Sequence, residues 1–338
     1  MKSIAILVIS LGVILIGAEV FVNGIEWLGK KLNLSEGAVG SVLAAVGTAL
    51  PETIIPIIAL VFGGSDKGTE IGIGAILGAP LMLSTLAMFV TGMAVLVFSR
   101  RRKAGTKVLA DYSSMSRDLG FFIIVFTAAV LTGILPPELR NWQITIACFM
   151  LFSYIWYVYS TLTEERDITA DSDVPPLYLA RKQKSPSLSI ILLQILVALV
   201  FVIGGADLFV VSTTEVAVTY GVPAFVLALI VAPVATELPE KFNSIIWISR
   251  EKDTLALGNI TGAMVFQSSV IPAIGIFMTD WQLTGGAFIA AILALLSAAI
   301  MYIELISKKH ISAGVLLGGG VFYGIFLISV FEGIIKQL

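Results

Sequence analysis

Two short motifs of similar composition carry the residues best suited to chemistry. In each, a glutamate directly follows a proline, and these glutamates are Glu52 and Glu240. Both lie inside apolar stretches, where a charge costs about 2.5 to 3.5 kcal/mol on membrane-insertion scales and is a functional candidate by default. Their threonines, Thr48 and Thr236, come one helical turn earlier, so each hydroxyl shares a face with its carboxylate.

The prolines of the two motifs add a third kind of oxygen. Pro51 and Pro239 have no backbone N–H, so the carbonyls four residues earlier, at Gly47 and Ala235, lose their usual helical donor. Free carbonyls of this kind coordinate cations in transporters. Carboxylate, hydroxyl and carbonyl oxygens together suit calcium, sodium or a similar hard cation.

The second motif carries more charge than the first. Glu237 stands where the first motif has Ala49, and Lys241 follows it at the favourable spacing of four residues. Two interpretations stay open for Glu237, as an ion ligand or as the buried partner of Lys241. Gln267, in the next apolar stretch, is expected to supply a further oxygen.

Composition identifies the solvent in which these motifs work. Of 338 residues, 57% are hydrophobic and only 13% charged, with a mean hydropathy of +0.99, which is typical of an integral membrane protein. The 21 basic and 23 acidic residues nearly balance, which removes the electrostatic argument for a nucleic-acid partner. A single cysteine, Cys148, excludes an internal disulfide, and a single histidine, His310, argues against a zinc site.

Ten apolar runs are long enough to cross a membrane as helices, so the predicted fold class is an all-α integral membrane protein. The runs are 3–25, 38–62, 71–98, 119–135, 142–161, 188–210, 222–248, 254–279, 285–305 and 311–333. Connections after the odd-numbered helices hold sixteen basic residues, and the other side, termini included, holds four. This asymmetry predicts a multi-pass cell-membrane protein with the odd loops in the cytoplasm and both termini outside.

The chain also repeats itself at a shift of 188 residues. Without a gap, this shift aligns 16–22 with 204–210 and 46–52 with 234–240. A loop shorter by four residues then aligns 74–79 with 258–263. We therefore expect a first five-helix repeat at 1–161, a cytoplasmic linker at 162–187 and a second repeat at 188–338. Because five is an odd number, the second repeat must enter the membrane from the opposite side, as in many secondary transporters.

Two further sets of aligned residues are expected to be structural. Glu19 and Asp207 are interpreted as interfacial acids near the ends of the first and sixth helices. Glycines spaced four apart are interpreted as sites of close helix packing. These glycines are Gly74, Gly78, Gly258 and Gly262.

The motif pair resembles a known family. The segments Gly-Thr-Ala-Leu-Pro-Glu at 47–52 and Ala-Thr-Glu-Leu-Pro-Glu at 235–240 are similar to the two alpha repeats of the sodium/calcium exchanger family, in the calcium/cation antiporter superfamily. The resemblance implies ten helices, alternating access by sliding of the first and sixth helices, and ion sites centred on Glu52 and Glu240, with Thr48 and Thr236 beside them.

This chain departs from the family pattern at several polar positions. Exchangers usually have serine where Ala49 and Glu237 stand. They also tend to have serine and then asparagine or aspartate in the next helix of each repeat. The matching residues here are Ala79 and Leu83 in one copy and Ala263 and Gln267 in the other.

The leading hypothesis is a sodium/calcium antiporter that uses a carboxylate site in the middle of the membrane. The alternative is a proton-coupled antiporter of calcium or another divalent cation, because a carboxylate in low dielectric has a raised pKa and can carry a proton. A channel is disfavoured because the polar residues gather at one depth, and an enzyme because no nucleophile and base motif is present. We expect no cofactor, no obligatory protein partner, and only transported cations (calcium, sodium or protons) and the lipid bilayer as partners.

Overall fold

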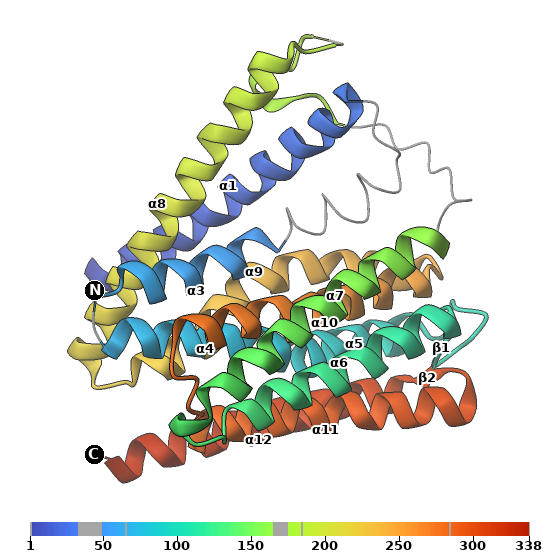
Figure 1. Ribbon diagram of the computed structural model, residues 1–338. Helices are drawn as coiled ribbons and strands as arrows, with labels where there is room; N and C mark the ends of the chain where they lie inside the picture. The colour runs from blue at the N-terminus through green and yellow to red at the C-terminus, as the bar shows by residue number, and fades with distance from the viewer. Residues whose placement is uncertain are drawn as a thin grey trace.

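The computed structural model describes residues 2–32, 49–64, 66–164, 175–183, 185–283 and 285–337, and within them the side chains of 162, 164, 238–243 and 334–337 are not described. Long helices account for most of this part of the chain (Figure 1). They are α1 (Lys2–Lys31), α3 (Leu50–Phe62), α4 (Asp66–Met82), α5 (Met88–Phe98), α6 (Tyr112–Thr132), α7 (Arg140–Glu164), α8 (Leu188–Tyr220), α9 (Ala224–Ser249), α10 (Asp253–Met278), α11 (Gly285–Lys308) and α12 (Ala313–Gln337).

Short elements connect these helices. A π-helical turn, η2 (Leu83–Ala87), joins α4 to α5, and 3₁₀ turns occur at η3 (Pro137–Leu139) and η4 (Tyr178–Ala180). Two strands, β1 (Lys107–Val108) and β2 (Ile311–Ser312), pair in antiparallel register.

Within the described residues, eight helical segments are long and apolar enough to cross a membrane, and α3 and the segment Ala224–Glu237 are shorter apolar helices. The chain is thus an all-helical membrane protein with about eight to ten apolar helices. Nine of the predicted apolar runs fall on these helices to within a few residues at most ends. The run 38–62 is described only from residue 49 onward.

Among the starts of the predicted runs that the structure describes, the start of 119–135 differs most from the start of its helix. α6 begins at Tyr112 because the Asp111 carboxylate caps it, accepting a 2.8 Å hydrogen bond from the backbone N–H of Ser114. Polar residues in the first turn hid this start from the hydropathy pattern. The helix then ends at Thr132, four residues before Pro136.

α1 and α8 form a long pair that packs mainly on itself (Figure 1). A Cβ on Gly17 would lie 2.8 Å from the side chain of Val202, and a Cβ on Gly205 would lie 2.8 Å from the side chain of Ile14. Only glycine therefore permits this approach. α1 contributes a second such glycine, Gly24, where a Cβ would lie 2.7 Å from the side chain of Ile195.

A second close crossing joins α4 to α9. A Cβ on Gly74 would lie 2.5 Å from the carbonyl oxygen of Phe225, and one on Gly78 would collide with the carbonyl of Leu229. The packing interpretation is confirmed for these two glycines. A Cβ on Gly258 or Gly262 meets no described atom within 4 Å.

The two aligned acids are not at helix ends, so that expectation is wrong. α1 continues past Glu19 to Lys31, and α8 continues past Asp207 to Tyr220. Both side chains are exposed. The predicted runs that end at 25 and 210 therefore underestimate the length of both helices.

Candidate cation-binding site

Glu52 lies in the first turn of α3 and is buried, with 7% of its surface exposed. Pro51 suits this turn because its fixed φ is helical. The backbone N–H of Thr53 donates to the carbonyl of Ala49 at 3.1 Å, which continues the turn. A helix N-terminus also favours a carboxylate through its dipole.

α9 contributes two adjacent buried polar residues. Thr236 is 2% exposed and Glu237 is 4% exposed. The Thr236 hydroxyl donates to the carbonyl of Ala232 at 3.0 Å, and its oxygen keeps lone pairs that can coordinate a cation. α9 is helical through Pro239, so a free carbonyl at the half-buried Ala235 would result from the missing proline N–H and not from an unwound segment.

Gln267, in the middle of α10, is the most unusual polar side chain of this set. It is 1% exposed, yet neither its amide oxygen nor its amide nitrogen makes a hydrogen bond to any described residue. Leaving a buried polar group unsatisfied costs about 1 to 3 kcal/mol. Such a group calls for an explanation, for example a water or an ion.

The helices that carry these residues touch one another. α3 contacts α9 and α10, and α9 contacts α10. Gly47 and Thr48 lie outside the described residues, as do the side chains of Glu240 and Lys241. Among the described residues, no three His, Cys, Asp or Glu side chains are close enough to hold a metal ion. That Glu52, Glu237 and Glu240 share one site therefore stays a prediction.

Each of the two aligned halves also contains a pair of hydroxyl residues that the sequence motifs did not reveal. Ser84 and Thr85 are fully buried around the π-helical turn η2, and Ser268 and Ser269 are fully buried in α10. The spacing of 184 that aligns the glycines of α4 and α10 also aligns these pairs. The internal repeat could therefore have identified these pairs, which begin one residue after Leu83 and Gln267.

The η2 turn itself has an identifiable cause. The Ser84 hydroxyl donates to the carbonyl of Pro80 at 2.8 Å, and the Ser84 carbonyl accepts from the hydroxyl of Ser297 on α11 at 2.6 Å. A proline together with a hydroxyl bonded to the helix backbone loosens the regular ladder. π-Helical turns of this kind are frequent at functional sites.

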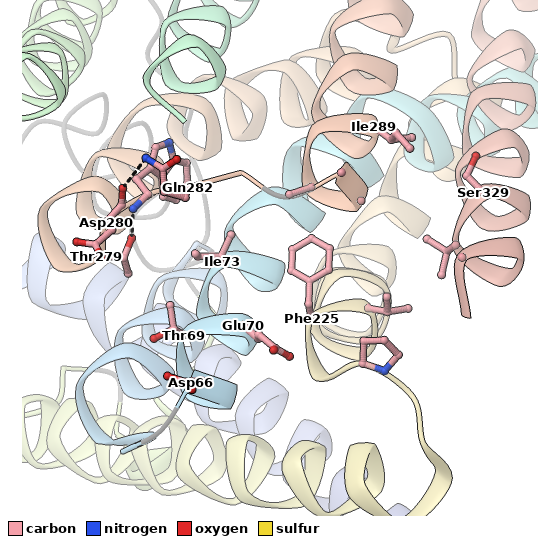
Figure 2. A pocket seen from close by; sticks show the side chains of 18 of the residues that line it. Asp66, Thr69, Glu70, Ile73, Phe225, Thr279, Asp280, Gln282, Ile289 and Ser329 are labelled. Atoms are coloured by element: carbon pink, nitrogen blue, oxygen red, sulfur yellow. Dashed lines mark hydrogen bonds between the residues drawn. The ribbon is translucent and has the colours of Figure 1, made fainter. Parts of the chain in front are cut away.

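A large cavity lies away from all of these residues (Figure 2). It measures about 1120 Å³ and is bounded by the start of α4, the starts of α9 and α11, the segment between α10 and α11, and the end of α12. Its described lining includes the carboxylates of Asp66, Glu70 and Asp280 and no basic side chain. Figure 2 shows Glu70 and Phe225 projecting into it from neighbouring helices. The charged side chains of its described lining are therefore all acidic.

Comparisons with known proteins identify the family of this chain. The sequence matches the family described as sodium/calcium exchanger protein over residues 2–163 and 190–332. An uncharacterized membrane protein of Methanocaldococcus jannaschii is 24% identical over 267 residues, covering 78% of this chain and 79% of the relative.

Two kinds of solved exchanger share the fold. An H⁺/Ca²⁺ exchanger, CAX, superposes with a TM-score of 0.76 at 17% identity, covering 98% of this chain and 84% of that one. The sodium-calcium exchanger NCX_Mj superposes with a TM-score of 0.58 at 18% identity, covering 97% of this chain and 98% of that one. The family match extends over both halves of the chain, so the chain belongs to the sodium/calcium exchanger protein family, whose members are membrane cation exchangers and not enzymes.

Proposed function

We propose that this protein is a sodium/calcium antiporter that works by alternating access, with one mid-membrane site formed by Glu52, Glu240, Thr48, Thr236 and Glu237, the carbonyls of Gly47 and Ala235, and Gln267. The single observation that carries the proposal is Gln267. Its fully buried amide has no described hydrogen-bond partner and lies on a helix that touches those of Glu52 and Glu237, so its oxygen is available to coordinate a cation there. No cofactor and no protein partner is needed.

The proposal includes ten transmembrane helices in two inverted repeats, 1–161 and 188–338, joined by a linker. Gly17 approaches residues 198 and 202, and Gly205 approaches residues 10 and 14. Adding 188 to the residue numbers on α1 and subtracting 188 from those on α8 converts one contact into the other. Reciprocal contacts are characteristic of a two-fold relation, which supports inverted repeats paired through α1 and α8.

The mechanism is competition for one set of oxygens. Calcium with its two charges and sodium with one both prefer carboxylate, hydroxyl and carbonyl ligands. If the α1 and α8 pair can pass across the site only when an ion neutralises the carboxylates, uptake of one ion must be coupled to release of the other. The odd-numbered loops are cytoplasmic in this proposal, because sixteen basic residues lie there and four on the other side.

Proton coupling is the second candidate, and Glu237 favours it. A buried glutamate here replaces the serine usual in exchangers, and nonpolar Ala79 and Leu83 stand where the family tends to have polar ligands. More carboxylates and fewer neutral oxygens suit a site that exchanges a divalent cation for protons, because a carboxylate can accept a proton whereas the neutral oxygens do not become charged.

The test is calcium flux in proteoliposomes with variants that keep shape and remove charge. Glu52→Gln and Glu240→Gln should each abolish gradient-driven calcium uptake and calcium binding to the purified protein. Glu138→Gln changes an exposed glutamate in η3 and is the matched control, which should transport normally. Full flux in both site variants would refute the proposed site.

A further inference from the structure

The end of the segment between α7 and α8, residues Pro175 to Gln183, lies against the α1 and α8 pair; we name it the strap. Its Leu177 is fully buried in the apolar cluster that α1 and α8 share, and Ala180 is 9% exposed. Two buried amides, Asn23 of α1 and Gln194 of α8, lie beneath it. The strap is therefore anchored by both apolar and polar contacts.

Gln194 connects three segments at once. Its amide nitrogen donates to the carbonyl of Val20 at 3.0 Å and to Oδ1 of Asn23 at 3.0 Å, both on α1. Its amide oxygen accepts from the backbone N–H of Leu179 in the strap at 2.9 Å. One fully buried side chain of α8 thus holds both α1 and the strap.

α1 holds the strap through residues of its own. The indole N–H of Trp27 donates to the carbonyl of Pro175 at 2.8 Å, and the Asn23 amide nitrogen donates to the same oxygen at 3.3 Å. Oδ1 of Asn23 accepts from the backbone N–H of Tyr178 at 3.3 Å. The Tyr178 hydroxyl donates to Oε1 of Glu19 at 2.5 Å. Contacts along α1 therefore extend over more than two helical turns.

This arrangement does not follow the internal repeat. The residue 188 positions before Gln194 is Ile6, and the residue 188 positions after Asn23 is Val211. Neither can reproduce the amide pair. Among the described residues the strap fastens α1 to α8 at one end of the pair, next to Lys30 and Lys31.

We infer that the strap makes α1 and α8 move as one body during exchange, with Gln194 and Asn23 as positioning residues that never touch the transported ion. This inference rests on the proposed function. A pair that slides across an ion site without separating must resist shear along its length. The glycine contacts at Gly17 and Gly205 are close packing without directional bonds, whereas the hydrogen bonds of the strap fix the axial register of one helix against the other.

Two variants weaken the attachment of the strap, one by a change in α8 and one by a change in the strap itself. Gln194→Leu removes all three bonds of the amide from α8, and Leu177→Ser removes the apolar anchor from the strap. The matched control is Gln143→Leu, because Gln143 is an equally buried amide on α7 that bonds to Arg140 and to the carbonyls of Thr132 and Leu135, far from the strap in sequence.

Each variant receives three measurements on the full chain. In proteoliposomes, maximal calcium exchange per folded molecule should fall about tenfold with Gln194→Leu or Leu177→Ser, a size consistent with the loss of one to three hydrogen bonds in a rate-limiting state. The calcium concentration for half-maximal exchange, and calcium binding in detergent, should not change. Trypsin cleavage after Arg181 or Lys182, both exposed residues of the strap, should become faster because the strap detaches.

The outcomes separate this inference from the proposed function. Faster cleavage together with wild-type exchange would show that the strap has no role in transport and would overturn the inference. Unchanged cleavage, or an equal loss of exchange in Gln143→Leu, would overturn it as well. Absence of gradient-driven exchange in the wild-type protein would instead refute the proposed function, and trypsin cleavage would still test whether the strap is docked.

Discussion

The guanidinium of Arg102 binds both carboxylate oxygens of Asp253. Nη1 donates to Oδ1 and Nη2 donates to Oδ2, each at 2.7 Å, and the two side chains are 1% and 6% exposed. Arg102 also donates to the carbonyls of Ile248 and Lys107. One buried ion pair therefore joins the segment after α5 to the start of α10, the helix that carries Gln267.

Breaking this pair should destabilise the fold strongly. Arg102→Met leaves the Asp253 carboxylate buried without its partner, which costs about 3 to 5 kcal/mol. Arg102→Lys should restore only part of the loss, because lysine cannot bind both oxygens in the same fork geometry. Thermal unfolding of the purified protein in detergent measures both. Arg101→Met changes an exposed neighbour and is the control; an equal melting temperature for Arg102→Met and Arg101→Met would contradict this assignment.

The cap of α6 predicts a pH dependence. The hydrogen bond from the Ser114 backbone N–H holds the pKa of Asp111 below its usual range. A group whose pKa is lowered in the folded state stabilises the fold above its unfolded pKa and loses that effect as the pH falls through its folded pKa. Asp111→Ala should therefore cost about 1 kcal/mol at neutral pH, and the difference from wild type should shrink below roughly pH 4.

Unfolding of the two proteins at several pH values measures this difference. Ser113→Ala, which changes the exposed residue next to Ser114, should have the stability of wild type at every pH. A difference between Asp111→Ala and wild type that stays constant down to acidic pH would show that the cap does not depend on the ionised carboxylate.

The α1 and α8 contact should not tolerate larger side chains at its glycines. Gly205→Leu would drive a side chain into Ile14, so calcium exchange should fall sharply. Gly204→Leu is a matched control one position away, because a Cβ there meets nothing within 4 Å. Similar exchange rates for the two variants, measured at equal amounts of folded protein, would mean that the close approach is not required.

Gln267 should contribute to ion binding at the expense of stability. Gln267→Leu removes a buried amide that makes no described hydrogen bond, so the fold without ions should be as stable as wild type or more stable. A ligand at a hundred times its dissociation constant stabilises a fold by about 2.7 kcal/mol. The stabilisation that calcium gives should therefore shrink in the variant. An undiminished calcium-dependent shift in melting temperature would exclude Gln267 as a ligand.

Much of the fold could be predicted from the sequence because a membrane imposes a simple pattern. Apolar runs located the helices, and the shift of 188 also relates the contacts of Gly17 to those of Gly205. The ends of the helices were harder to predict from the sequence. A cap such as Asp111 is polar and does not appear in a hydropathy pattern, and the predicted first and sixth runs ended before α1 and α8 do.

The site was only partly predictable for a different reason. The positions of Glu52, Thr236, Glu237 and Gln267 in apolar stretches could be read from the sequence, and all four side chains are buried. The strap was missed because its bonds to α1 join residues more than 140 positions apart, and nothing in the local sequence around Pro175 indicates which helices it meets.

The most direct test is calcium uptake by wild-type proteoliposomes under two separate gradients. A sodium/calcium antiporter should take up calcium rapidly when a sodium gradient directed out of the vesicles is imposed at equal pH on both sides, and should take up none when all gradients are absent. Uptake that responds only to a pH gradient would replace sodium by protons as the coupling ion. No uptake under either gradient would contradict the assignment of this chain as a calcium antiporter.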